Sequence, residues 1–223
     1  MEVSKVRLDH LVAERGLAPS RERARALILA AQVSVDGRVL TKAGAQIEPD
    51  AAVALVAPDH PYVGRGGLKL AHALDTFGIA VAGRDALDIG ASTGGFTDVL
   101  VQRGAARVVA LDVGHGQLDW GLRNDPRVVV VERFNARRLT PADLPGPVDL
   151  VCIDVSFISL RQILPVVPPL LRPHADVIAL VKPQFEAGRA EVRNGIIRDE
   201  AVHARVLDEV RAAAAAVGLT SAG

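Results

Sequence analysis

Residues 86–96, Ala-Leu-Asp-Ile-Gly-Ala-Ser-Thr-Gly-Gly-Phe, pass from a short apolar run into a glycine-rich turn, and an apolar-periodic segment follows to Val101. This pattern predicts a strand, a tight loop and a helix start, an arrangement that presents a helix N-terminus to a ligand. The glycine spacing, G-x-x-x-G-G, differs from the dinucleotide fingerprint G-x-G-x-x-G, and no P-loop lysine follows it. Because Asp88 ends the strand, the loop favours a ligand with a positive or hydroxyl-rich end over a pyrophosphate.

Four more apolar runs predict further strands, at residues 107–112, 128–131 and 150–153 and in a segment that ends at 179–182. Continuous apolar strands that alternate with helical segments indicate a mostly parallel, doubly wound α/β sheet. Ligands of such sheets bind at the carboxyl ends of the strands. Polar residues follow all five runs: Asp88, Asp112, Asn135, Asp154 and Lys182. Asp112 stands where nucleotide-binding folds place the carboxylate that accepts ribose hydroxyls.

The first forty residues predict a separate, small α+β module. Apolar residues at helical spacing indicate one helix after Leu8, and Ser20 is a typical N-cap for a second helix. Alternation over residues 33–40 around Asp36-Gly37 predicts a β-hairpin. Two helices and a hairpin in so short a stretch form a compact module.

The composition excludes several classes of protein. The 223 residues carry 26 basic and 26 acidic side chains, so a basic surface must come from their arrangement. The single cysteine, Cys152, excludes a disulfide framework and fits a reducing cytoplasm. The sequence shows no signal-peptide hydrophobic region, no apolar run long enough to span a membrane, and no histidine spacing typical of a metal site. We therefore expect a soluble cytoplasmic protein without a metal.

The N-terminal module resembles the S4 RNA-binding domain over about residues 6–52. The resemblance rests on helix caps, hairpin and basic positions in the same order: Arg7-Leu-Asp, Gly16-Leu17, Ser20-Arg21, Ala24, Leu27-Ile28 and Val33 to Gly37. Taken alone, the arginines of the second helix would indicate only a solvated helix face. The resemblance implies that Arg7, Arg21 and Arg25 bind structured RNA, mostly through phosphates, which position a protein without reading sequence.

The rest of the chain resembles TlyA-type proteins, which are ribosomal RNA 2′-O-methyltransferases with an FtsJ-like catalytic domain behind an S4 domain. Six motifs appear in the family's order: Arg65 to Lys69, Leu87 to Thr97, Ala110 to Leu118, Arg123 to Arg127, Asp154 to Ser159 and Val181 to Phe185. The resemblance implies an S4-like domain at residues 1–59, a linker at 60–63 and a Rossmann-like methyltransferase domain at 64–223.

The same resemblance implies S-adenosylmethionine as the cofactor and ribosomal RNA or ribosomal subunits as the partner. The methionine and ribose part of the cofactor would lie against the glycine-rich loop, the ribose hydroxyls against an acid, and the adenine near an amide. The residues in these positions are Asp88, Gly90, Gly94, Gly95, Asp112 and Asn135.

The catalytic residues implied by the family are the first three members of a Lys-Asp-Lys-Glu tetrad. They correspond to Lys69, Asp154 and Lys182. Lys182 would be the base that activates the ribose hydroxyl, and Lys69 and Asp154 would orient and tune it. A lysine accepts a proton only when neutral, and a second lysine together with partial desolvation favours the neutral amine.

The sequence departs from the family at the fourth member of the tetrad. In the family this glutamate belongs to a motif close to G-N-x-E after the last helix, and no such motif occurs up to Gly223. Glu186 and Glu191 do not match it. We expect the methyltransferase domain to lack its last two strands, and residues 1–223 alone to fold weakly and have low activity, because a sheet edge would be unpaired.

Two other classes of function stay open. One is a non-catalytic RNA-binding or ribosome-assembly factor that uses the S4 module with a vestigial cofactor fold. The other is a haemolysin-like cytolysin, a label that some relatives carry. The cytolysin is opposed by the absence of a membrane span and of a basic amphipathic helix with aromatic anchors beside Trp120. The methylated nucleotide, the ribosomal subunit and the oligomeric state stay open.

Overall fold

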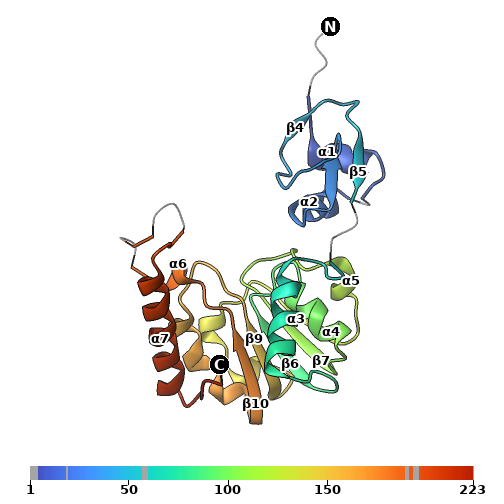
Figure 1. Cartoon of the computed structure of the whole chain (residues 1–223). Coiled ribbons are helices and arrows are strands. Elements are labelled where there is room, and N and C mark those ends of the chain that lie inside the picture. The colour runs from blue at the N-terminus through green and yellow to red at the C-terminus, as the bar shows by residue number, and fades with distance from the viewer. Residues whose placement is uncertain (1–4, 19, 57–59, 189–190, 193–195, 223) are drawn as a thin grey trace. The chain divides into compact units, whose positions relative to one another are not determined.

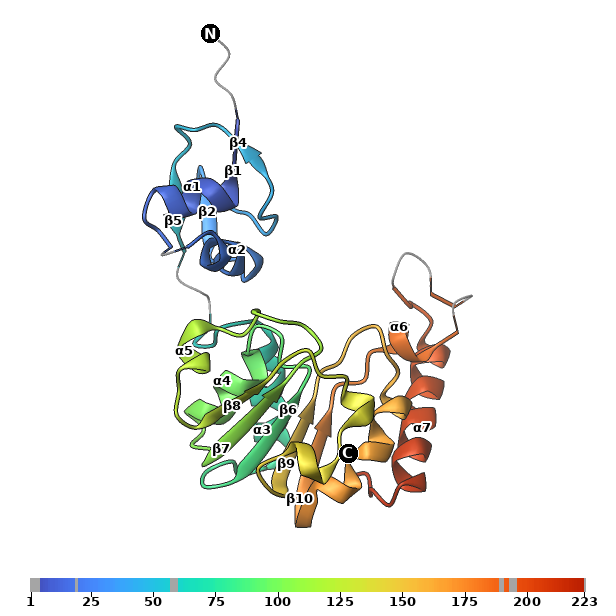
Figure 2. The same cartoon turned by 180° about the vertical axis from the view of Figure 1, so that it is seen from behind.

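The computed structural model describes residues 5–18, 20–56, 60–188, 191–192 and 196–222 (Figures 1 and 2). The chain forms two compact units, Met1–Leu68 and Lys69–Gly223. Residues 57–59, which end the predicted S4-like domain just before the linker at 60–63, lie outside the described residues. The domain boundaries at residues 59 and 64 therefore stay a prediction.

The first unit consists of short helices and strands: β1 (Val6–Arg7), α1 (Leu8–Glu14), α2 (Arg21–Leu29), β2 (Val33–Val35), β3 (Arg38–Val39), β4 (Gln46–Ile47) and β5 (Val53–Leu55). Strands β3, β2 and β5 form one antiparallel sheet, and β1 pairs with β4. The predicted N-cap is confirmed, because the Ser20 hydroxyl accepts a hydrogen bond from the Arg23 N–H at 3.1 Å. The predicted hairpin is confirmed as well: Asp36 and Gly37 both have positive φ, which a type I′ turn requires.

The second unit is built around one sheet. Its elements are α3 (Gly66–Phe77, which begins just before the division), β6 (Asp85–Ile89), α4 (Gly95–Gln102), β7 (Arg107–Leu111), α5 (Trp120–Arg123), β8 (Val128–Val131), η1 (Ala136–Arg138), η2 (Pro141–Asp143), β9 (Val148–Ile153), η3 (Leu160–Gln162), η4 (Leu164–Val166), η5 (Pro168–Leu170), β10 (Leu171–Ala179), α6 (Pro183–Glu186) and α7 (Glu200–Ala216). The strand order is β10-β9-β6-β7-β8, and each neighbouring pair is parallel. This confirms the predicted Rossmann-like α/β fold. The strand order reverses between β6 and β9, and doubly wound sheets bind their ligands at such a point.

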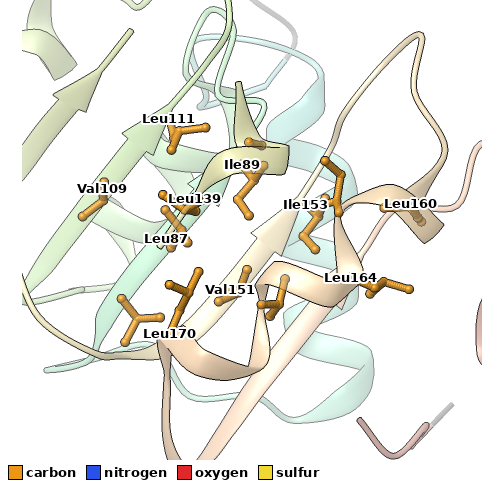
Figure 3. Close-up of a cluster of buried hydrophobic side chains, with 14 of the residues drawn as sticks. Leu87, Ile89, Val109, Leu111, Leu139, Val151, Ile153, Leu160, Leu164 and Leu170 are labelled. Carbon is orange, nitrogen blue, oxygen red and sulfur yellow. The ribbon is translucent and has the colours of Figure 1, made fainter. Parts of the chain in front are cut away.

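The two faces of the sheet are covered by different elements. Leu87 and Ile89 of β6 belong to a hydrophobic cluster that also contains residues of η3, η4, η5 and α7 (Figure 3). Successive side chains of a strand point to opposite faces, so Ala86 and Asp88 face the other way, toward α4. The direction of each β6 side chain is thus set by this alternation.

The last strand ends earlier than the sequence pattern predicts. The apolar run extends to Lys182, whereas β10 ends at Ala179. Pro183 begins α6, since a residue with no N–H and a fixed φ suits the first turn of a helix better than a strand. Lys182 therefore lies between strand and helix, at the N-cap position of α6.

Cys152 lies in the centre of the sheet, on β9. Its side chain is fully buried, and it pairs in register with Asp88 of β6. Burial raises the pKa of this thiol well above its ordinary value, as does the nearby Asp88 carboxyl. Within the part of the chain that the structure describes, no helix has the length and hydropathy needed to cross a membrane.

Candidate active site

A cleft of about 440 Å³ opens at the carboxyl ends of the central strands. Its walls come from the segments that follow β6, β7, β8 and β9. Four of the predicted site residues line it: Gly90, Asp112, Asn135 and Asp154. The cleft therefore lies beside the point where the strand order reverses, as expected for a ligand site in this fold.

Gly90 is the point of closest approach between two of these segments. Its φ is +91°, and a Cβ atom at this position would lie 2.7 Å from the backbone oxygen of Asp154. Both the left-handed conformation and the contact require glycine. The loop after β6 thus packs directly on the backbone that carries Asp154.

Asp88, predicted as a cofactor contact, is placed beneath the cleft and is not one of the residues that line it. Its side chain is fully buried, and one oxygen accepts a hydrogen bond from the Thr97 hydroxyl at 2.6 Å. The other oxygen is buried without a hydrogen-bond partner. Burial raises the pKa of Asp88 to about 7, against the opposing effect of the Thr97 hydrogen bond. Direct contact between Asp88 and a cofactor stays a prediction.

Gly94 and Gly95 form the start of α4. Gly94 is the N-cap residue with a φ of 100°, and Gly95 is the first helical residue. Both are buried, and neither lines the cleft. They shape the turn between β6 and α4, and a contact of either with a cofactor also stays a prediction.

Asp112 is held in the wall of the cleft by backbone groups. One carboxylate oxygen accepts a hydrogen bond from the Ser92 N–H at 2.8 Å, and the other accepts one from the Gly114 N–H at 2.6 Å. A carboxylate oxygen can accept more than one hydrogen bond, so Asp112 can still accept from a hydroxyl in the cleft. Asn135, on the next segment, caps η1 by accepting from the Arg137 N–H at 3.1 Å.

Lys182 and Asp154 meet after β10 and β9. The lysine Nζ lies 2.5 Å from the Asp154 Oδ1 and donates a hydrogen bond to the Ser156 hydroxyl at 2.9 Å. Both members of the ion pair are mostly buried, each with 18% of its side chain exposed. The Phe185 ring centroid lies 6.0 Å from the same nitrogen. The amine is therefore held in one place at the edge of the cleft, where Asp154 and Ser156 are lining residues.

Lys69, predicted to accompany this pair, lies on α3 and is exposed. Among the described residues, no ion pair joins Lys69 to a carboxylate. The structure thus brings together two of the three predicted catalytic residues, and the contribution of Lys69 stays a prediction.

Glu186 has a structural role that the sequence motifs did not indicate. Its side chain is buried, and its two oxygens accept hydrogen bonds from the Ser159 hydroxyl and from the Leu160 N–H, the latter at 2.7 Å. Glu186 follows Lys182 on α6, whereas Ser159 follows Asp154. This carboxylate therefore ties together the two segments that carry the ion pair.

Phe157 lies inside the motif from Asp154 to Ser159, but the sequence did not indicate a role for it. It lines the cleft, 91% of its surface is exposed, and its φ is +64°. A bulky residue in the left-handed region is rare and concentrates at functional sites. Its ring centroid lies 5.1 Å from that of Phe185, the ring that lies next to the Lys182 amine.

In the first unit, one buried carboxylate organises two of the predicted RNA-binding arginines. Asp9 accepts two hydrogen bonds from Arg7, at 3.0 and 2.8 Å, and its Oδ2 lies 3.3 Å from the Arg21 Nε. The hydrogen bonds from Arg7 hold the pKa of Asp9 below its usual value. Arg25 is exposed on the same helix as Arg21, one turn later. Their binding to RNA stays a prediction.

Two family models match the chain. Residues 62–221 match the FtsJ-like methyltransferase model, and residues 6–53 match the S4 domain model. The chain belongs to the FtsJ-like methyltransferase family, with an S4 domain in front of the catalytic part. The predicted resemblance to both families is confirmed.

Within that family the chain is similar to TlyA proteins. It is 49% identical over 221 residues to the 16S/23S rRNA (cytidine-2′-O)-methyltransferase TlyA of Mycobacterium tuberculosis, covering 98% of this chain and 82% of the relative. It is 43% identical over 205 residues to Hemolysin A of Brachyspira hyodysenteriae, covering 91% and 85%. A solved structure from Streptococcus thermophilus, described as a hemolysin, superposes with a TM-score of 0.76 at 44% identity and covers 99% of this chain and 82% of its own.

Proposed function

We propose that this chain transfers a methyl group from S-adenosylmethionine to a ribose 2′-hydroxyl of ribosomal RNA. The observation that carries the proposal is the Lys182–Asp154 ion pair at the edge of a cleft that also presents the Asp112 carboxylate. The similarity to TlyA proteins named as rRNA 2′-O-methyltransferases supports the substrate class. Ribosomal RNA as substrate also implies a cytoplasmic protein.

The cleft has the features that S-adenosylmethionine requires. Asp112 is held in place by two backbone N–H groups and would accept hydrogen bonds from ribose hydroxyls. Gly90 has no side chain, so a ligand could come close to its backbone, and Asn135 would offer an amide to the adenine. Asp88, Gly94 and Gly95 would support the loop from beneath. When bound, the cofactor supplies an electrophilic methyl group, so the protein has only to place the acceptor and remove one proton.

Lys182 is the group that removes this proton in our proposal. A neutral amine can accept the 2′-hydroxyl proton, while Asp154 and Ser156 keep its nitrogen in a fixed position. Lys69 would help to orient the same amine, as the resemblance to the family implies. No step requires a metal.

The S4 domain would hold the RNA. Arg7 and Arg21 present guanidinium groups anchored on Asp9, with Arg25 beside them, and guanidinium pairs well with phosphate. We propose domains at residues 1–59 and 64–223 with a linker at 60–63. The contacts to phosphates would position a ribosomal subunit or its RNA for the catalytic part.

The test compares two substitutions of Lys182. Lys182→Met removes the amine, whereas Lys182→Arg keeps a positive charge beside Asp154 but cannot act as a base, since guanidinium does not lose its proton in proteins. Tritium transfer from labelled S-adenosylmethionine to unmodified 16S and 23S transcripts and to unmethylated subunits is measured. Both variants should be inactive and still bind the cofactor by calorimetry.

Arg211→Met, which removes an exposed cation that pairs with Asp208 on α7, is the control. Activity of Lys182→Arg, or a methyl group mapped to a base instead of a ribose, would overturn the proposal. RNA binding without transfer by the unchanged protein would favour a non-catalytic RNA-binding factor.

A further inference from the structure

Three exposed arginines follow β8 within one short segment: Arg133, Arg137 and Arg138. The segment forms one wall of the cleft, with Phe134, Asn135, Ala136 and Arg137 among the lining residues. Its backbone is fastened to the loop after β7, because the N–H of Arg133 donates to the Gly114 carbonyl at 2.9 Å. The backbone that carries the arginines is therefore held in place beside the candidate active site.

These arginines differ from their counterparts elsewhere in the second unit. Among the described residues, none of the three guanidinium groups forms an ion pair with a carboxylate. Arg198 is also unpaired. Every other described arginine of this unit has an acidic partner: Arg84, Arg103, Arg107, Arg123, Arg127, Arg161, Arg172, Arg205 and Arg211. The net charge of the whole chain is zero. These three arginines without a carboxylate partner therefore give the segment a positive charge that the chain as a whole does not have.

The neighbouring acidic side chains are occupied by other groups. Glu132 pairs with Arg123 and accepts a hydrogen bond from the Gly116 N–H at 3.0 Å. Asp143 accepts from the Thr140 N–H at 2.9 Å, where it completes a capping box. Asp112 is bound to backbone N–H groups on both oxygens. None of these carboxylates has to be released before the arginines can bind an anion.

We propose that Arg133, Arg137 and Arg138 form a phosphate-binding rim that holds the RNA backbone next to the target ribose. The inference rests on the proposed function and assigns it a substrate contact in the catalytic unit. Guanidinium groups bind phosphate oxygens in a bidentate manner, and unpaired ones give up no ion pair on binding. The ligand is RNA and not the cofactor, because S-adenosylmethionine carries a positive sulfonium and no phosphate.

The test replaces all three residues together, as Arg133→Gln, Arg137→Gln and Arg138→Gln. Arg211→Gln is the matched control, because Arg211 is also exposed but is paired with Asp208 on α7. Filter binding to unmodified 16S and 23S transcripts is measured without cofactor between about 50 and about 200 mM KCl. Each lost phosphate contact reduces the magnitude of the negative slope of log K against log salt by about 1. The slope of the triple variant should therefore be smaller in magnitude by about 2 to 3. Its affinity at about 0.1 M salt should fall roughly tenfold or more, with the control unchanged.

Two further measurements separate this inference from the proposed function. Calorimetry with S-adenosylmethionine should give the same affinity for the double variant Arg133→Gln, Arg138→Gln and the unchanged protein, because the double variant keeps Arg137, whose guanidinium donates to Asn135 in the cleft. An unchanged salt slope in the triple variant, or a loss of cofactor affinity in the double variant, would overturn the phosphate-binding rim. Failure of the proposed function would appear differently, as an unchanged protein that binds RNA with the full salt slope but transfers no methyl group.

Discussion

Replacing Asp88 by asparagine would measure the energetic consequence of burying its carboxyl group. The side chain is fully buried, one oxygen accepts a hydrogen bond from Thr97, and the other has no partner. Burial raises its pKa from 3.8 to about 7. Asparagine has the same shape and no charge, and its carbonyl oxygen can accept the same hydrogen bond. Asp88→Asn therefore removes the titration and keeps the packing.

The sign and size of the effect follow from proton linkage. Between pH 3.8 and about 7 the folded protein binds more protons at Asp88 than the unfolded chain does, so the free energy of unfolding falls as pH rises through this window. One unit of pKa corresponds to about 1.4 kcal/mol, so the loss between about pH 5 and about pH 7 is about 2–3 kcal/mol. Carboxyls with lowered pKa, such as Asp125 and Glu132, act in the opposite direction but are common to both proteins.

Cys152 offers a reporter for this experiment. It is the single cysteine, fully buried beside Asp88 in the sheet, so its thiol becomes accessible only when the second unit unfolds. Urea unfolding is followed by pulse labelling with a dipyridyl disulfide, which reacts at acid and neutral pH. From about pH 5 to about pH 7, the unchanged protein should lose about 2–3 kcal/mol more than Asp88→Asn. Parallel pH dependences would refute the assignment of a raised pKa to Asp88.

Three further substitutions test particular contacts. Gly90→Ala places a Cβ 2.7 Å from the Asp154 oxygen at a φ of +91°, so cofactor affinity by calorimetry should fall roughly tenfold, and unchanged affinity would contradict the tight loop contact. Glu186→Ala leaves the buried Leu160 N–H without its acceptor and should lower the free energy of unfolding by about 1–3 kcal/mol. Glu186→Gln should restore part of that stability in urea unfolding, and equal stability of the two variants would argue against the hydrogen bond. Ser20→Ala removes an N-cap and should cost about 1 kcal/mol in thermal unfolding of the first unit, and an unchanged melting temperature would exclude this role.

The inner strands of the sheet could be predicted from the sequence because β6, β7 and β9 are buried on both faces. Such strands are continuous apolar runs. A helical segment between two strands lets the second strand run parallel to the first, so the pattern predicts a parallel sheet. The hairpin at Asp36-Gly37 was equally predictable, since positive φ at two successive positions restricts the residue types. In both cases local chemistry determines the structure.

The position of a side chain at the end of a strand was harder to predict. Asp88 and Asp112 both close an apolar run, but Asp88 lies within β6 and points to the α4 face, whereas Asp112 is the first residue after β7. Within a strand the alternation of faces fixes the side-chain direction, and beyond it the loop does. A difference of two register positions at the strand end therefore separates a buried group from one in the cleft.

Contacts between distant segments were not predictable from motifs. Glu186 does not match the motif of the family's fourth acid, yet its carboxylate accepts a hydrogen bond from the N–H of Leu160, which lies 26 positions earlier. Neither residue type nor spacing indicates this pair. The left-handed conformation of Phe157 likewise depends on its surroundings, because phenylalanine itself disfavours it.

The backbone hydrogen bonds of Asp112 have a consequence for how any ligand would be bound. Its carboxylate joins the loop of Ser92 to the loop of Gly114, so the entropy of ordering this acceptor is lost during folding and not on binding. Asp112 would therefore contact the ligand and also hold the two loops together. Truncating it would remove an acceptor and also release two walls of the cleft, so a lost affinity would measure both effects together. Asp112→Asn, which keeps one oxygen as an acceptor, would help to separate the loss of the ligand hydrogen bond from the loosening of the two loops.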